Sequence, residues 1–178
     1  MNEKEFSRIT GASCNGSSTA VTHAMVTMHR VLVAIGWGSP NSEPARRVEV
    51  DFESPLSPVS DVELSIDEMG ACLIMCINFR PKASLDVREQ ALRFITRANW
   101  ALVVGNFEMD IDNGALRFRS SLVFGDAELG ETLVRPLIAS AMDIVERHIT
   151  ALMQVLDEGL DTDIAIEAVW RIHDTEVM

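Results

Sequence analysis

The chain is short of positive charge, of cysteine and of long apolar runs. It holds 15 Lys and Arg residues against 27 Asp and Glu residues, which gives a formal net charge of −12 and a pI near 4.7. A surface this acidic repels the phosphate backbone of nucleic acids and the headgroups of anionic membranes. We therefore expect neither a nucleic-acid partner nor a membrane partner.

No apolar run is long enough to span a bilayer. The longest runs, 31–37 and 71–77, fall far short of the roughly 20 residues that a membrane-spanning helix needs. The first residues include the acidic Glu3 and Glu5 and lack the apolar segment of a secretory signal. These features predict a cytoplasmic protein.

Three cysteines make an odd count, and two of them share one predicted strand. At ~3.3 Å per residue, Cys72 and Cys76 lie about 13 Å apart on the same face of that strand. A disulfide requires Cα atoms within ~7 Å, so we expect reduced, buried thiols instead. The chain has no Cys-x-x-Cys pair beside a histidine, and we therefore expect no metal and no cofactor.

The four histidines do not suggest a catalytic site. His23 and His29 are six residues apart in a predicted helix, so they share no helical face. His148 falls on the apolar stripe of the last long helix, where a hydrogen-bonded core or interface histidine is the simpler interpretation. We expect no catalytic residues and no enzymatic activity.

The strongest local pattern surrounds Asn113-Gly114. Apolar residues alternate with acidic ones before this pair and with basic ones after it, the charged residues being Glu108, Asp110, Arg117 and Arg119. Alternation with period two is typical of a strand with one buried and one exposed face. Because Asn-Gly favours tight turns, the segment predicts a β-hairpin.

Two registers fit this hairpin. A two-residue type I′ turn sets Asp110 opposite Arg117 and Ile111 opposite Leu116, whereas a four-residue loop over 111–114 preserves the same facing with a shifted pairing. Either register buries one apolar set together: Phe107, Met109, Leu116 and Phe118. A slip by one residue is excluded because it would turn the charges into the core.

Helical and strand periodicities alternate along the rest of the chain. Helices are expected near 20–35, from Ser84 to about 102, near 131–158 and from Asp161 through Trp170, and further strands near 47–53, 62–66 and 71–79. The last of these strands is apolar on both faces, so we expect it at the centre of the sheet and covered on both sides. The expected fold is α+β: an antiparallel five-stranded sheet with helices packed on it, in the order α-β-β-β-α-β-β-α plus a short C-terminal helix.

Composition suggests a simple domain organisation. Residues 1–19 are polar and rich in Gly and Ser, so we expect a flexible N-terminal segment. Residues 20–178 have the length of one domain. Within it, 39–60 holds four of the six prolines and has the composition of a loop.

The segment 91–124 resembles the YbjN family. In that family a helix ending in an Asn-containing turn leads to a Gly-x-Phe strand and then to a Gly-x-Leu-x-Phe-Arg strand. The matching residues here are Asn99, then Gly105-Asn106-Phe107, then Gly114 through Arg119. The resemblance covers roughly 20–157. It implies a fold similar to that of type III secretion chaperones, which are small acidic dimers that hold extended segments of other proteins. Family members are described as sensory transduction regulators, and no activity or cofactor is implied.

We therefore expect a non-enzymatic protein-binding module, chaperone-like or regulatory, that acts as a homodimer and binds an unidentified protein. The alternative is a small-molecule-sensing regulator with a pocket between sheet and helices. Arg117 and Arg119 form a positive strip that either docks a partner carboxylate or makes ordinary cross-strand ion pairs. Trp37, Trp100 and Trp170 are candidate interface anchors, because Trp is enriched in binding hot spots, although each also suits a core.

Overall fold

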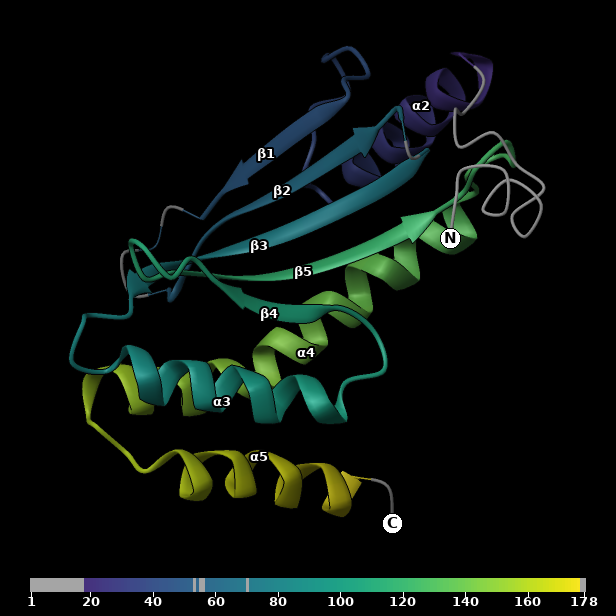
Figure 1. The fold of residues 1–178 in the computed structure, drawn as a ribbon. Helices are drawn as coiled ribbons and strands as arrows, with labels where there is room; N and C mark the ends of the chain where they lie inside the picture. Colours follow the sequence, from purple (N-terminus) through teal and green to yellow (C-terminus); the bar gives the residue numbers. More distant parts are fainter. Residues whose placement is uncertain (1–17, 53, 55–56, 70, 177–178) are drawn as a thin grey trace, which may run out of the picture. The chain divides into compact units, whose positions relative to one another are not determined.

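The computed structural model describes residues 18–52, 54, 57–69 and 71–176 (Figure 1). Its elements, in chain order, are α2 (Ser18–Ala34), β1 (Arg47–Asp51), β2 (Val59–Asp67), β3 (Cys72–Lys82), α3 (Arg88–Ala101), β4 (Asn106–Met109), β5 (Ala115–Val123), α4 (Glu131–Asp157) and α5 (Thr162–Glu176). This order confirms the predicted α+β fold. Of the flexible segment expected at 1–19, residues 1–17 lie outside the described part, and the helix already includes Ser18 and Thr19.

The five strands form one antiparallel sheet in the order β1-β2-β3-β5-β4. β5 therefore lies between β3 and β4, although α3 and β4 precede it in the chain. The predicted central strand is confirmed, because β3 occupies the middle of the sheet. In the part of the chain that the structure describes, no helix combines the length and the apolar character needed to cross a membrane.

The chain divides into two compact units, which we describe separately. One consists of Met1–Val48, Leu64–Ile74 and Ser121–Leu137, and the other of Glu49–Glu63, Met75–Ser120 and Ile138–Met178. The expectation of a single domain over 20–178 stays a prediction. We call the second set unit 2, because the features discussed below lie in it, and the first set unit 1.

In unit 1, α2 ends close to Gly36. Gly36 has φ +80°, and the N–H groups of Gly36 and Trp37 donate to the carbonyl oxygens of Val33 (3.1 Å) and Leu32 (2.8 Å). These two bonds make a Schellman motif, which satisfies the last carbonyl groups of a helix. Trp37 is half-buried there, and its backbone N–H makes one of the two bonds that close the helix.

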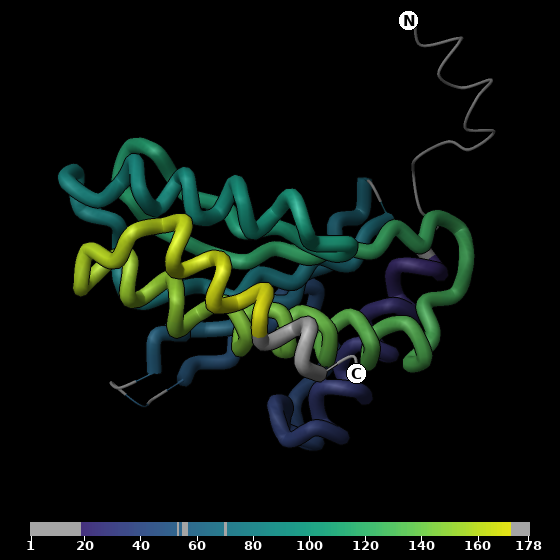
Figure 2. Tube along the Cα trace, turned by 90° about the horizontal axis from the view of Figure 1, so that it is seen from below, coloured from purple at the N-terminus to yellow at the C-terminus, as the bar shows by residue number. Residues whose placement is uncertain are grey.

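In unit 2, α3 and α5 lie side by side, as Figures 1 and 2 both show. Ala165 and Ile166 of α5 are fully buried. Asp161 caps the start of α5, since its Oδ1 accepts the N–H of Asp163 at 2.8 Å. The C-terminal helix was predicted to end near Trp170, and it continues to Glu176.

The start of α3 was predicted wrongly. The helix was expected to begin at Ser84. The helix begins instead at Arg88 after Val87, whose side chain makes no capping bond. Leu85 is 79% exposed, because it lies in the connection before the helix, and the buried face consists of Ala91, Phe94, Ile95 and Ala98.

The hairpin adopts the four-residue loop, and its pairs are Asn106↔Arg119, Phe107↔Phe118, Glu108↔Arg117 and Met109↔Leu116. Phe107, Leu116 and Phe118 are buried as predicted, but Met109 is only half-buried and Ile111 is 65% exposed in the loop. The type I′ turn fails because Gly114 has positive φ (+73°) and Asn113 does not. Asp110 holds the longer loop, since its Oδ1 accepts the N–H of Asp112 at 2.8 Å.

The two faces of β3, which was expected to be covered on both sides, are buried to different degrees. Leu73, Met75 and Ile77 have no exposed surface, whereas Asn78 on the other face is half-buried. Cys76 on that same face is 7% exposed. Burial is the main reason that the pKa of the Cys76 thiol is raised, although Arg117 lowers it in part. The thiol is therefore protonated at neutral pH and is a poor nucleophile.

We predict that Gly114→Ala destabilises the protein more than Gly159→Ala does. Both glycines have positive φ, which costs a residue with a Cβ about 1–2 kcal/mol. An added Cβ at Gly114 would also overlap the carbonyl oxygen of Ala83, whereas nothing lies within 4 Å of one at Gly159. Crowding of this kind adds about 1–3 kcal/mol. Denaturant unfolding of both variants measures the difference, and equal losses would contradict the close approach.

Candidate functional site

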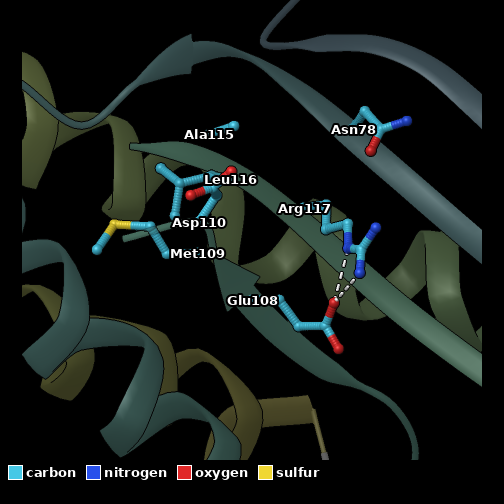
Figure 3. Close-up of a pocket in the computed structure, with 7 residues that line it drawn as sticks. All are labelled: Asn78, Glu108, Met109, Asp110, Ala115, Leu116 and Arg117. Atoms are coloured by element: carbon cyan, nitrogen blue, oxygen red, sulfur yellow. Dashed lines mark hydrogen bonds and ion pairs between the residues drawn. The ribbon is translucent and has the colours of Figure 1, made fainter. Parts of the chain in front are cut away.

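The Arg strip predicted on the hairpin is an ion-pair cluster centred on Glu108. Figure 3 shows Glu108 and Arg117 pointing toward each other, with Asn78 on the adjacent strand. The Nε and Nη2 atoms of Arg117 both lie 2.6 Å from Glu108 Oε2, and Arg119 Nη1 lies 3.7 Å from Oε1. Asn106 Nδ2 donates to Oε1 at 3.1 Å.

These contacts set the charge states of the cluster. Burial alone would raise the pKa of Glu108, but hydrogen bonds from Asn106 and Arg117 outweigh it and the pKa is lowered. The hydrogen bond from Glu108 in turn raises the pKa of Arg117. Glu108 is therefore ionised and already serves as the carboxylate partner of both arginines. This favours ordinary cross-strand pairing over the docking of a partner carboxylate.

A second candidate is an apolar groove within unit 2, of about 270 Å³. Its walls come from three segments: the end of α3 and the connection to β4 (Ala101–Val104), α4 (Ile144, His148) and α5 (Val169, Trp170). Asp143 and Arg147 of α4 also line it and pair with each other. The lining therefore has no net charge, and most of its residues are apolar.

Beside the groove stands an exposed apolar ridge, which we define as Trp100, Val103 and Val104. Their exposed fractions are 91%, 98% and 42%. Large apolar side chains at this exposure within one five-residue segment are typical of interaction sites rather than of ordinary surface. The ridge is the feature of this surface that most clearly suggests binding.

Asn99 explains why the ridge is held outside the core. Its side-chain Oδ1 accepts the N–H of Phe107 at 2.8 Å, and its Nδ2 donates to the carbonyl oxygen of Phe107 at 3.0 Å. The two bonds fix the end of α3 to the edge strand β4. Asn99 therefore has a structural role at this junction.

Trp170 is half-buried in the wall of the groove. The guanidinium carbon of Arg97 lies 5.3 Å from the centroid of its ring, a cation–π distance. Arg97 and Arg93 both pair with Asp163, and the Arg93 Nη2–Asp163 Oδ2 distance is 2.7 Å. This network holds α5 against α3 and so positions one wall of the groove.

His148 is one of the polar residues that line the groove. It is 7% exposed, its ring contacts Phe107 at 5.4 Å between centroids, and its Nδ1 lies 2.8 Å from the carbonyl oxygen of Ile144. A carbonyl oxygen only accepts, so the neutral ring carries its hydrogen on Nδ1 and keeps a lone pair on Nε2. The expected core or interface histidine is confirmed by this burial and this bond.

The sequence-predicted site residues are therefore divided between three places. Arg117 and Arg119 belong to the strand cluster, Trp100 and Trp170 belong to the ridge and the groove wall, and Trp37 ends α2 in unit 1. The sequence interpretation missed Val103, Val104 and the α4 wall. The available signal was the uncharged run Trp100–Val104, which continues from the end of α3 into the connection to β4, where polar residues are the rule.

Among the described residues, no group of three or more His, Cys, Asp and Glu side chains is arranged to hold a metal ion. The buried, protonated Cys76 thiol and the carbonyl-bound His148 do not form a nucleophile and base. The lining of the groove is mostly apolar, and its charged residues, Asp143 and Arg147, pair with each other.

We predict that protonation of His148 weakens the fold. Burial is the main cause that lowers its pKa from the ordinary 6.5, and Arg147 adds to it, while the bond to Ile144 opposes it. The unfolded chain therefore takes up this proton first, so stability present above pH 6.5 is lost as the pH falls toward the lower folded-state pKa. Unfolding free energies measured from pH 8 to 5 should show a drop in the native protein that is smaller in His148→Phe. The same drop in both would assign it to other groups.

Comparisons with known proteins agree with this fold. Residues 62–154 match the model of the YbjN family, described as "Putative bacterial sensory transduction regulator". The crystal structure of YbjN from E. coli is similar, with a TM-score of 0.51 and 10% identity over 75% of this chain and 90% of that one. The crystal structure of the ExsC-ExsE complex gives a TM-score of 0.50 and 17% identity over 69% of this chain and 88% of that one.

No curated protein gives a significant match. The structural similarities, at such low identity, establish the fold, while the family match covers more than half of the sequence. The chain belongs to the YbjN family.

Proposed function

We propose that this protein is a non-enzymatic protein-binding module, chaperone-like or regulatory, that acts as a homodimer and binds another polypeptide through apolar surface. The observation that carries the proposal is the ridge beside the groove. Trp100 and Val103 are almost fully exposed in a protein whose net charge is otherwise −12. Acidic surface elsewhere keeps such a patch soluble while it is unoccupied.

Two further facts support protein binding. The family description names a regulator, and a structure of the same fold is a two-protein complex, ExsC-ExsE. The exposed Trp belongs to the residue type most enriched in binding hot spots.

The expected cytoplasmic location stays a prediction.

The alternative, a small-molecule-sensing regulator, has less support from the groove. Pockets for small ligands usually enclose about 300–1,000 Å³ with several convergent polar groups. The groove holds about 270 Å³, and most of its lining residues are apolar. A shallow apolar surface next to an exposed Trp suits a protein side chain better than a metabolite.

The edge of the sheet formed by β4 is a poor site for strand addition. The N–H and C=O groups of Phe107 face that edge, and both are bonded to the side chain of Asn99. A partner strand would have to displace these bonds. We therefore place partner binding on side-chain surface rather than on this strand edge.

We predict that Val103→Asp abolishes capture of the partner. Tagged protein purified from its own host, with mass spectrometry, should recover a polypeptide with the native chain and with Leu85→Asp, and at least ten-fold less with Val103→Asp. Leu85 is a matched control because it is also an exposed apolar residue, at 79%, but lies outside the ridge. A charge buried without a partner at an interface costs more than the ~1.4 kcal/mol that a ten-fold loss requires.

Both variants should keep the native unfolding temperature, since each changes an exposed side chain. Equal recovery with both variants would remove the ridge from the proposal. Saturable binding of a metabolite, with no polypeptide recovered, would transfer the function to the sensing alternative.

A further inference from the structure

The Asn113-Gly114 pair at the end of the hairpin loop has a reactivity that its place in the turn does not use. When Asn precedes another residue, the backbone nitrogen of that residue can attack the side-chain Cγ of Asn, which closes a five-membered imide ring and expels ammonia. Glycine in the second position allows the fastest closure, because no Cβ crowds the attacking nitrogen and the backbone turns freely. The pair is therefore a candidate for spontaneous deamidation, a reaction that makes Asn one of the thermolabile residues of proteins.

In the closed loop, hydrogen bonds hold both reacting groups. The N–H of Gly114 donates to the carbonyl oxygen of Asp110 at 2.8 Å, and Gly114 is buried. The Asn113 amide is fixed at both ends, because its Nδ2 donates to Asp110 Oδ2 at 2.6 Å and its Oδ1 accepts the N–H of Ala115 at 2.8 Å. Ring closure requires the nitrogen to lose its proton and the amide carbon to turn toward it. These bonds therefore oppose the reaction while the loop is closed.

The loop can open without unfolding of the protein. Asp110 and all three residues of 111–113 are exposed, so opening breaks hydrogen bonds and uncovers little apolar surface. Exposed hairpin tips belong to the least stable parts of a fold and open far more often than the core. The rate of a slow reaction in such a loop follows the fraction of time that the loop is open.

The product of the reaction does not restore the closed loop. Water opens the imide at either carbonyl carbon, which leaves a carboxylate at position 113 on an ordinary aspartyl or on an isoaspartyl backbone. Asp110 Oδ2 now receives a hydrogen bond from that side chain, so it would face a second carboxylate instead, and two adjacent carboxylates oppose each other's ionisation. The isoaspartyl form adds a methylene group to the backbone and would displace Gly114, whose carbonyl oxygen accepts the N–H of Ala83 at 2.9 Å.

We propose that Asn113 is a self-modification site, at which opening of the hairpin loop permits deamidation and deamidation then prevents the loop from closing. A bond forms between Gly114 N and Asn113 Cγ, the Cγ–Nδ2 bond breaks, and the Gly114 proton leaves with the amide as ammonia. Solvent water then opens the ring. The site needs no enzyme, oxidant or cofactor, and each event adds one negative charge to the loop. This modification is independent of the proposed function.

The start of α3 would respond to the change. Arg88 Nη1 donates to the carbonyl oxygen of Ile111 at 2.7 Å, and the N–H of Ala83 is bonded to Gly114, so the loop holds the segment that leads into the helix. The helix has no side-chain cap of its own at Val87. We therefore expect the modified protein to loosen at the hairpin tip and at the first turn of α3, while the other end of the helix stays fixed.

Mass spectrometry of the full chain during incubation at neutral pH measures the reaction. Trypsin releases Asn113 in the peptide 98–117, and fragmentation assigns to it the mass gain of NH exchanged for O. Because each hydrogen bond lost on opening favours the closed loop, Asn113 should react about ten-fold more slowly in the folded protein than in guanidinium chloride. Asp110→Ala, which removes the carboxylate acceptor of the amide, should react about ten-fold faster than the native protein while still folded by circular dichroism.

A second pair, Asn15-Gly16, lies outside the described residues and falls in a different tryptic peptide, 9–30. In guanidinium chloride it gives the rate of an Asn-Gly pair in the same unfolded molecules, and Asn113 should match it. An equal rate for Asn113 in the folded and unfolded protein would overturn the proposal. So would no conversion of Asn113 in the folded protein after an incubation that converts it fully in guanidinium chloride and is then extended about ten-fold.

Two substitutions test the consequence separately from the rate. Asn113→Asp supplies the product charge, whereas Asn113→Ala is the matched control that loses the same hydrogen bond without adding charge. At neutral pH the amide of Ala83 should exchange its hydrogen about ten-fold faster in Asn113→Asp than in Asn113→Ala, since a neighbouring charge that shifts a carboxyl pKa by one unit has this effect. The difference should vanish in acid, where both carboxylates are protonated. Equal exchange of Ala83 in the two variants at neutral pH would refute the release of the loop, and this comparison still decides if Asp110→Ala does not fold.

Discussion

The side-chain amide of Asn99 joins the end of α3 to the outermost strand of the sheet, and the exposed surface of unit 2 depends on that junction. The amide makes both hydrogen bonds that a neighbouring strand would offer to Phe107. It thereby ends the sheet at β4 and fixes where the connection Trp100–Gly105 leaves the helix. Gly105 has φ +69°, and an added Cβ there would overlap the ring of Phe118, so the chain must pass the core closely at this point. Because both ends of the connection are fixed, its apolar side chains cannot turn into the core.

This constraint explains an arrangement that burial alone would not produce. Five uncharged residues in a row would normally be drawn into a core, but Ala98 and Phe94 already fill the buried face of α3 and Phe107 fills that of β4. Trp100 is therefore exposed because the hydrogen bonds between Asn99 and Phe107 fix the end of α3, and not because the core is poorly packed. Exposed apolar side chains of this size are typical of interaction sites, whereas surface ion pairs contribute little, so the proposed function is placed on the ridge.

The sequence predicted the facing of the hairpin correctly because alternation is a local property, but it left the register open because register depends on contacts made across the fold. The longer loop is selected by Asp110, which bonds to the N–H of Asp112, and by the approach of Gly114 to Ala83, 31 positions earlier in the chain. The same limit applies to the start of α3, which was predicted at Ser84 and lies at Arg88. The groove could not be predicted at all, since its walls come from α3, α4 and α5 and meet only through tertiary packing.

Family membership accounts for part of this surface and not for the rest. The matched segment, residues 62–154, includes Asn99, the ridge and His148, so the junction and the acceptor lie within the part that the family model describes. Trp170 and Val169 lie beyond it, on a helix held by Asp163 and its two arginine partners. Without α5, the groove beside the ridge would lack the wall that Val169 and Trp170 form. The wall that α5 supplies to the groove therefore lies outside the segment that the family model matches.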